Sequence, residues 1–238
     1  MNILAIECAT EVASVALSTP AGMRERRSGG EKQSAFLLPA VDALLAEAGI
    51  ARGAIDGIAV GRGPGAFTGV RFGLAVAQGL AFGLDRPALA ISSLAALALQ
   101  AAHDCRSDAG TCVLALFDAR MDEVYGGAFE FAGDDRVTAL GAEFLSAPSA
   151  LQVPRGTALL VAGSGLAAYR MQVAVVVGTR PFVAAAESFP TASALARLAR
   201  PEFAAGRGGS AETLCPVYLR DKVALTEVER GRGHSTSQ

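Results

Sequence analysis

The sequence predicts an α/β protein built from two related lobes. Each half of the 238-residue chain opens with two adjacent strands and then alternates helices with strands. No residue-level repeat accompanies this shared order. A polar, glycine-containing stretch at residues 103–111 separates the halves. We therefore expect an N-terminal lobe at 1–105, a C-terminal lobe at 106–222 and a disordered, charged tail at 223–238.

Apolar periodicity and turn residues place the elements in order. The strands expected in the first half span 2–8, 12–18, 23–28, 55–61 and 87–91. Three helices are expected there, at 34–48, 67–84 and 92–102, with Ser34 and Ser92 as N-caps and Gly49 as a C-terminal stop. In the second half we expect strands at 112–117, 123–130 and 158–162, and a helix at 191–205 interrupted at Pro201.

Composition limits the functional classes. Hydrophobic residues form 51% of the chain, enough for a full core, and the net charge is only -2. The densest basic cluster is Arg24, Arg26 and Arg27, which suits a solvated edge strand better than a nucleic-acid grip. Four scattered cysteines, no signal peptide and no run long and apolar enough to span a membrane predict a cytoplasmic protein.

A glycine-rich segment at residues 61–71 joins the fourth strand to a very apolar helix. Gly61, Gly63 and Gly65 can form an anion nest at the helix N-terminus. However, a P-loop needs a lysine here, and a dinucleotide fingerprint belongs on the first strand–helix turn. The favoured interpretation is a tight turn whose glycines permit positive φ and close backbone approach.

The helix at 67–84 is apolar on nearly every side. At 100° per residue, one face lies against the sheet of its own lobe and carries Gly69, Gly73, Val76, Leu80 and Leu84. The opposite face carries Phe67, Arg71, Leu74, Ala75, Gln78 and Phe82. Mixed apolar, Arg and Gln character is typical of a protein interface, so we expect a second polypeptide to cover this face. Coverage by the helices at 34–48 or 92–102 remains the alternative. On the first view, Leu74→Arg abolishes association and leaves the fold intact.

Catalytic signatures are weak. The two histidines, His103 and His234, form no metal-binding pair, and no Ser-His-Asp or Gly-x-Ser-x-Gly pattern is present. The acids nearest strand ends are Glu7, Asp118, Asp122 and Glu123. Either a structural or a catalytic role fits them, and an acid–arginine pair that fixes the 118–123 turn is favoured.

Six segments together resemble the TsaB (YeaZ) family over residues 2 to about 224. They are residues 3–11, 61–71, 77–81, 92–95, 118–125 and 216–220, and the segment 61–71 is the most specific. The resemblance implies a two-lobed actin/Hsp70/sugar-kinase-like (ASKHA) fold, each lobe a mixed sheet with flanking helices. It also implies a part in forming N6-threonylcarbamoyladenosine at position 37 of tRNAs that read ANN codons.

The resemblance further implies the partners. A TsaD-like subunit carries the nucleotide, the metal and the transfer reaction, a TsaE-like ATPase joins, and this chain is a non-catalytic scaffold that homodimerises when its partner is absent. The family pairs through helices matching 34–48 and 67–84, which adds Leu37 and Val41 to the predicted interface. No cofactor, no metal, no membrane and no tRNA contact outside the complex are expected.

Two positions depart from the family pattern. Glu7 stands where relatives carry Asp, so any cation held there would shift, and Gln33 stands where many relatives have His. The competing hypothesis is a nucleotide-dependent kinase or ATPase of the same fold, which needs a phosphate cradle and a metal-holding acid. A peptidase is disfavoured because no histidine pair is present.

Overall fold

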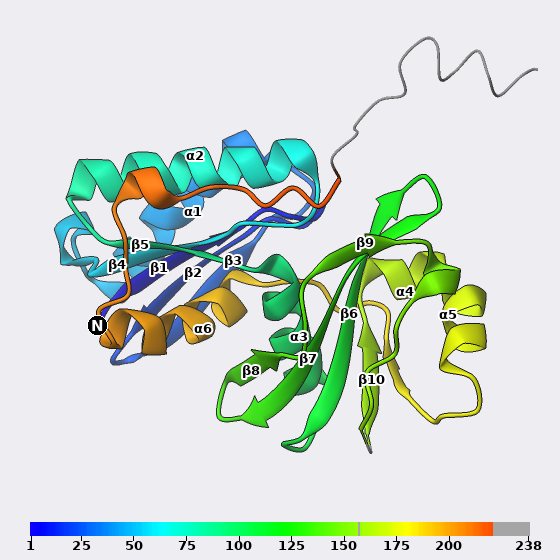
Figure 1. The fold of residues 1–238 in the computed structure, drawn as a ribbon. Coiled ribbons are helices and arrows are strands. Elements are labelled where there is room, and N and C mark those ends of the chain that lie inside the picture. Colours follow the sequence, from blue (N-terminus) through cyan, green and yellow to red (C-terminus); the bar gives the residue numbers. More distant parts are fainter. Residues whose placement is uncertain (157, 221–238) are drawn as a thin grey trace, which may run out of the picture.

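The computed structural model describes residues 1–156 and 158–220, which form two β-sheets with helices on both faces (Figure 1). The strands of the first sheet are β1 (Ile3–Glu7), β2 (Ser14–Thr19), β3 (Gly22–Arg27), β4 (Gly57–Gly61) and β5 (Ala88–Ile91). Those of the second are β6 (Thr111–Arg120), β7 (Glu123–Gly133), β8 (Arg136–Ala139), β9 (Phe144–Ser146), β10 (Leu159–Ala162) and β11 (Val183–Ala185). The helices are α1 (Gln33–Ala48), α2 (Phe67–Leu84), α3 (Ser93–Asp104), α4 (Ser164–Ala168), α5 (Arg170–Val177) and α6 (Ala192–Ala204), with short 3-10 turns η1 (Arg52–Ala54), η2 (Pro148–Ala150) and η3 (Ala211–Thr213).

The two sheets share one strand order, which confirms the predicted pair of related lobes. The first runs β3-β2-β1-β4-β5 and the second, read in the same sense, β8-β7-β6-β10-β11. In the first sheet β3, β2 and β1 pair antiparallel, and β4 and β5 continue from β1 in parallel. In the second sheet β8, β7 and β6 pair antiparallel, and β10 and β11 continue from β6 in parallel. In each sheet, therefore, the carboxyl ends of three parallel strands meet at one edge, where open α/β sheets bind ligands.

Three apolar cores hold the layers together. The first lies between the outer face of the first sheet and helices α1 and α2, and the second between the outer face of the second sheet and helices α4 and α5. The third fills the space between the sheets, where side chains of both inner faces pack on α3 and α6. The two lobes therefore share a continuous core.

Helices α3 and α6 are exchanged between the lobes. The α3 helix follows the strands of the first sheet but packs on β6, β7 and β10, whereas α6 follows the second sheet but packs on β1, β2 and β4 (Figure 1). The boundary predicted at residue 105 separates the strands of the two sheets, whereas the packing of α3 and α6 crosses it. A helix packs where its apolar face can be buried, and the apolar faces of α3 and α6 both point into the shared core.

After α6 the chain returns along the first lobe. Residues 205–220, here called the C-terminal strap, pair with the edge of β5 through Ala88 and Gly209 and then run beside α2 (Figure 1). Leu214 of the strap is buried in the same core as α2. The predicted tail at 223–238 lies outside the described residues.

Most of the predicted elements are present within a few residues of their expected ends. Gly49 ends α1 with a left-handed φ of 66°, and the Ser92 hydroxyl accepts a bond from the Ala95 amide at the start of α3. Two details are wrong. Lys32 rather than Ser34 precedes α1 without a side-chain cap, and α6 continues through Pro201. The sequence patterns also missed α4, α5 and the short strands β8, β9 and β11.

Two glycines of α2 should respond oppositely to alanine. A Cβ at Gly69 would lie 2.2 Å from the Cys8 carbonyl oxygen, whereas one at Gly79 meets open space. Gly69→Ala should therefore lower the free energy of unfolding by about 1–3 kcal/mol, and Gly79→Ala should raise it by up to about 1 kcal/mol through helix propensity. Urea denaturation of both variants measures this, and equal effects would contradict the packing.

Candidate functional site

The glycine-rich segment packs against the end of β1 at three points. A Cβ built on Gly61 would lie 2.3 Å from Glu7 Oε2, one on Gly65 2.3 Å from the Ala9 carbonyl oxygen, and one on Gly69 2.2 Å from the Cys8 carbonyl oxygen. The Ala66 amide also donates to the Ala9 carbonyl oxygen at 2.8 Å. Side chains at these positions would push the segment off the strand, so close approach accounts for the glycines.

This packing agrees with the tight-turn interpretation. Gly63 has a φ of 84°, which favours glycine, and the segment enters α2 without a side-chain cap. Its amide at Ala66 is already bonded to β1 and is not free to bind an anion. The role of Gly61, Gly63 and Gly65 as an anion nest stays a prediction that no contact in the structure favours.

Glu7 is wholly buried behind this segment. Its Oε1 accepts bonds from the backbone amides of Cys8 (2.8 Å) and Ala9 (2.7 Å), and its Oε2 accepts one from the Ser93 hydroxyl (2.8 Å). Burial raises the pKa of the Glu7 carboxyl from 4.5 to about 7, against the lowering effect of these three bonds. The side chain thus joins the end of β1 to the first residue of α3 and does not face the cleft.

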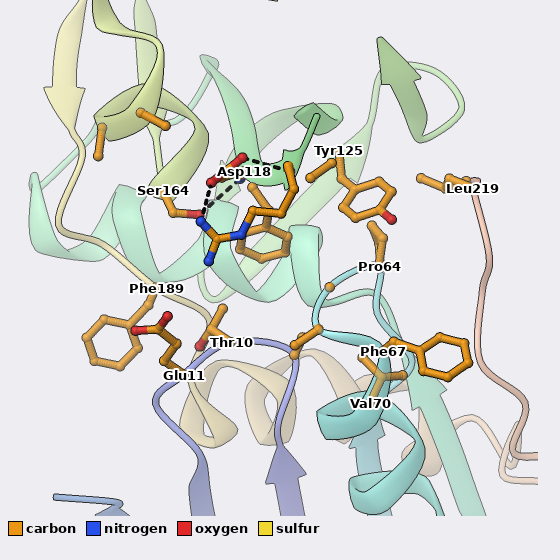
Figure 2. A pocket seen from close by; sticks show the side chains of 18 of the residues that line it. Thr10, Glu11, Pro64, Phe67, Val70, Asp118, Tyr125, Ser164, Phe189 and Leu219 are labelled. Carbon is orange, nitrogen blue, oxygen red and sulfur yellow. Dashed lines mark hydrogen bonds and ion pairs between the residues drawn. The ribbon is translucent and has the colours of Figure 1, made fainter. Parts of the chain in front are cut away.

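A cleft of about 880 Å³ opens between the lobes at the carboxyl ends of the parallel strands (Figure 2). The first lobe contributes residues 9–12 and 64–67 and the second contributes residues 117–120 and Ser164, while strap residues 217–220 line it as well. Most of its wall is apolar, including the rings of Phe117, Phe189 and Tyr218.

The charges around the cleft are mostly negative or already paired. Glu11, Asp118 and Glu187 line it. Of the two arginines, Arg120 is bonded to Asp118 at 3.1 Å, and Arg220 donates to Glu123 at 2.6 Å. A phosphate chain entering here would face these carboxylates, because neither arginine is unpaired. Among residues 1–156 and 158–220, no three His, Cys, Asp or Glu side chains come together as a metal site.

The 118–123 turn has an uncommon backbone. Arg120, Met121 and Asp122 all have positive φ, at 61°, 56° and 56°. The Asp118 carboxylate accepts from the Arg120 amide at 2.8 Å and from its guanidinium, so the acid–arginine pair does hold the turn. Three successive non-glycine residues in the left-handed region are costly and need surrounding contacts to persist.

The expected partner-facing side of α2 is only partly exposed. Phe82 is 81% exposed, Phe67 is 50% exposed, and Arg71 and Ala75 are exposed as well. Leu74, however, is buried in the outer core of its own lobe. The prediction that Leu74→Arg spares the fold is therefore wrong, because that variant would place a charge in a dry core.

Leu37 and Val41 of α1 are also buried in the outer core. Their side chains pack under the helix and offer nothing to a second chain, so both residues are removed from the predicted interface. Leu38, one position further along, is 51% exposed and is the large apolar side chain that α1 presents to solvent. Helical periodicity identified the apolar positions of α1 but not which of them the sheet would cover.

The C-terminal strap forms hydrogen bonds with two polar side chains of α2. Gln78 Nε2 donates to the Leu214 carbonyl oxygen at 2.9 Å, and Arg71 Nε donates to the Tyr218 hydroxyl at 2.6 Å. The Arg71 guanidinium also stacks 3.7 Å over the Phe67 ring. The expectation that only another polypeptide could satisfy Arg71 and Gln78 is wrong. The segment 216–220 of the strap was recognised in the sequence, but nothing in it indicated that the strap would lie beside α2.

Comparison with known proteins places this two-lobed architecture in the machinery of threonylcarbamoyladenosine synthesis. Residues 29–227 match the family model TsaD, tRNA N6-adenosine threonylcarbamoyltransferase. Two proteins described as "tRNA threonylcarbamoyladenosine biosynthesis protein TsaB" are similar nearly end to end. The one from Haemophilus influenzae is 33% identical over 94% of this chain and 95% of its own, and the one from Bacillus subtilis is 30% identical over 92% and 94%.

A solved structure agrees with the sequence comparison. YeaZ from Pseudomonas aeruginosa superposes with a TM-score of 0.82 at 40% identity, over 92% of this chain and 99% of that one. The chain belongs to the TsaB (YeaZ) family of tRNA threonylcarbamoyladenosine biosynthesis proteins. The predicted ASKHA-like fold, two lobes each with a mixed sheet and flanking helices, is confirmed.

The buried carboxyl of Glu7 should make stability fall as pH rises. Between pH 4.5 and about 7 the unfolded chain releases this proton while the folded chain keeps it, so the free energy of unfolding falls as the pH rises. Above about pH 7 the loss is complete, at about 3 kcal/mol. Glu7→Gln should remove the contribution of Glu7 to the fall in the free energy of unfolding between pH 5 and pH 8, as measured by chemical denaturation. Glu7→Asp, which keeps a carboxyl there, is the matched control. Parallel profiles for Glu7→Gln and the unchanged protein would contradict the assignment.

Proposed function

We propose that this chain is the non-catalytic partner subunit of the complex that forms N6-threonylcarbamoyladenosine at position 37 of ANN-reading tRNAs. In this proposal it binds and activates a TsaD-like catalytic subunit in the cytoplasm. A TsaE-like ATPase joins them, and the chain pairs with itself when the catalytic subunit is absent. It meets tRNA only through the complex.

The exposed apolar face of the first lobe carries this proposal. Phe67 and Phe82 of α2 and Leu38 of α1 are each at least half exposed, and both helices cover the same face of the first sheet (Figure 1). Large apolar side chains gathered on one exposed face are typical of a protein-binding surface. Arg71 and Gln78 remain at the edge of this face, held in place by the C-terminal strap.

Small residues on the same side of α2 favour a helix as the occupant. Ala75 and Gly79 are exposed between the two phenylalanines, Gly83 is exposed next to Phe82, and a Cβ at either glycine would meet only open space. Their small size allows another helix to approach closely, so the two phenylalanines can insert beside it. By length and apolar composition α2 could also cross a membrane, but it is packed on the sheet and strap of its own lobe.

The cleft supports a non-catalytic role. An ASKHA enzyme needs a phosphate cradle and an acid that holds a metal ion. Here Glu7 points into the protein interior, where its oxygens are bonded to Ser93 and to two backbone amides. The remaining carboxylates of the cleft, Glu11 and Glu187, would repel phosphate.

Replacing the most exposed aromatic side chain should prevent partner binding. Phe82→Arg places a charge on the proposed interface, near the C-terminal end of α2, and should weaken binding of the TsaD-like subunit by about 10- to 100-fold, since buried aromatic anchors dominate interfaces. Isothermal titration or light scattering measures it.

Met171→Arg is the control for this experiment. Met171 lies on α5 of the other lobe and is 76% exposed, so its replacement also adds a surface charge but far from the proposed face. This variant should bind normally. Phe82→Arg binding as tightly as Met171→Arg would place the interface elsewhere.

The competing kinase or ATPase hypothesis is tested by calorimetric titration of the isolated chain with ATP and Mg²⁺. We expect no binding in the micromolar range, because the two arginines among the described residues of the cleft are both paired with carboxylates. Stoichiometric micromolar binding would favour the enzyme and overturn the scaffold proposal.

A further inference from the structure

Two segments that are far apart in the sequence meet each other at the cleft. One is the C-terminal strap, which ends at Tyr218, Leu219 and Arg220, and the other is the 118–123 turn between β6 and β7. The strap belongs by its packing to the first lobe, and the turn belongs to the second. Both line the cleft between the lobes.

The strap is fixed to the first lobe at successive points. Gly209 and Ala88 exchange two backbone bonds, and the Leu214 carbonyl oxygen accepts from Gln78. Further along, the Val217 amide donates to the Arg62 carbonyl oxygen at 3.0 Å. Tyr218 then lies beside the Phe67 ring, with centroids 6.0 Å apart. The strap is thus anchored along the side of α2 that borders the exposed face.

Arg220, the last strap residue that the structure describes, extends from the first lobe to the 118–123 turn of the second lobe. Arg220 Nη2 donates to the Ala119 carbonyl oxygen at 3.0 Å and to Glu123 Oε2 at 2.6 Å, and Nη1 contacts the Met121 sulfur. The Arg220 side chain is only 15% exposed. Ala119 and Glu123 flank the three residues of positive φ, so the guanidinium holds both ends of a backbone that is costly by itself.

A second polar link joins the lobes. Glu143, in the loop between β8 and β9, forms an ion pair with Arg62 at 3.1 Å and accepts a bond from the Ser92 hydroxyl. Arg62 is the residue whose carbonyl oxygen holds Val217 of the strap. The strap and the Glu143 link therefore meet at Arg62.

We infer that the strap is a clasp that couples the exposed α2 face to the 118–123 turn on the other side of the cleft. Tyr218 contacts Phe67 and Arg71 at one end, and two residues later Arg220 holds the 118–123 turn. A partner covering Phe67 and Tyr218 also immobilises the strap and thereby keeps Arg220 on the turn. Coupling between two sites is reciprocal. The factor by which the partner stabilises the Arg220 contacts is therefore also the factor by which loss of these contacts weakens partner binding. The partner half of this inference rests on the proposed function, whereas the clasp within the chain does not.

Hydrogen exchange on the full isolated chain tests the clasp. Arg220→Ala should speed exchange about three- to tenfold in the peptides covering 214–220 and 118–125, and leave those of the shared core in α3 unchanged. Arg207→Ala is the matched control, because Arg207 lies on the same strap but pairs with Glu202 of the first lobe. If Arg220→Ala leaves the 118–125 peptides as in the Arg207→Ala variant, the clasp is refuted.

Adding the TsaD-like subunit tests the coupling. In the unchanged chain the partner should slow exchange both in α2 and in residues 118–125. In Arg220→Ala the protection of α2 should remain while that of 118–125 is lost, and affinity should fall about fivefold. Protection of 118–125 that survives Arg220→Ala would mean direct contact by the partner and would overturn the coupling. Absence of any binding to the unchanged chain would instead refute the proposed function, with the clasp judged by the first experiment.

Discussion

At Gly61, Gly65 and Gly69 the chain comes so close to the end of β1 that a single methyl group would collide with residues 7–9. The rest of the first lobe depends on this close approach. It sets the position of α2 on the sheet, and it encloses Glu7 so that the carboxyl bonds to Ser93 at the start of α3. A motif that resembles a phosphate loop in composition is thereby used for packing, and the proposed partner-binding surface is the exposed side of α2.

The exchange of α3 and α6 ties the two lobes into one folding unit. Each helix covers the inner face of the sheet that it does not follow in sequence, so neither lobe can bury its inner sheet face without the other. The C-terminal strap adds a further crossing, from α2 to the 118–123 turn. The strap in this way connects the exposed face of α2 to the cleft, through its own backbone and through its polar contacts. This connection is present without a ligand in the cleft.

Sequence patterns were most successful where a local physical rule decides the structure. Gly49, with no Cβ, ends α1 in the left-handed region, and Ser92 caps α3 through its hydroxyl. They failed where burial depends on distant chain. Leu37, Val41 and Leu74 have the same apolar character as Leu38 and Phe82, and only packing on the sheet separates the buried set from the exposed one. Arg71 and Gln78 found partners about 140 residues away in the strap.

By itself the sequence determined the two α/β lobes, the strand–glycine–helix unit and the family, because these follow from short-range periodicity, backbone constraints on glycine, and specific motifs. Only the tertiary structure decided that α3 and α6 change lobes, that the strap covers the polar edge of α2, and that Arg220 reaches the 118–123 turn. These contacts join residues far apart in the chain. They arise from the shared burial of apolar surface and from geometry that no local pattern records.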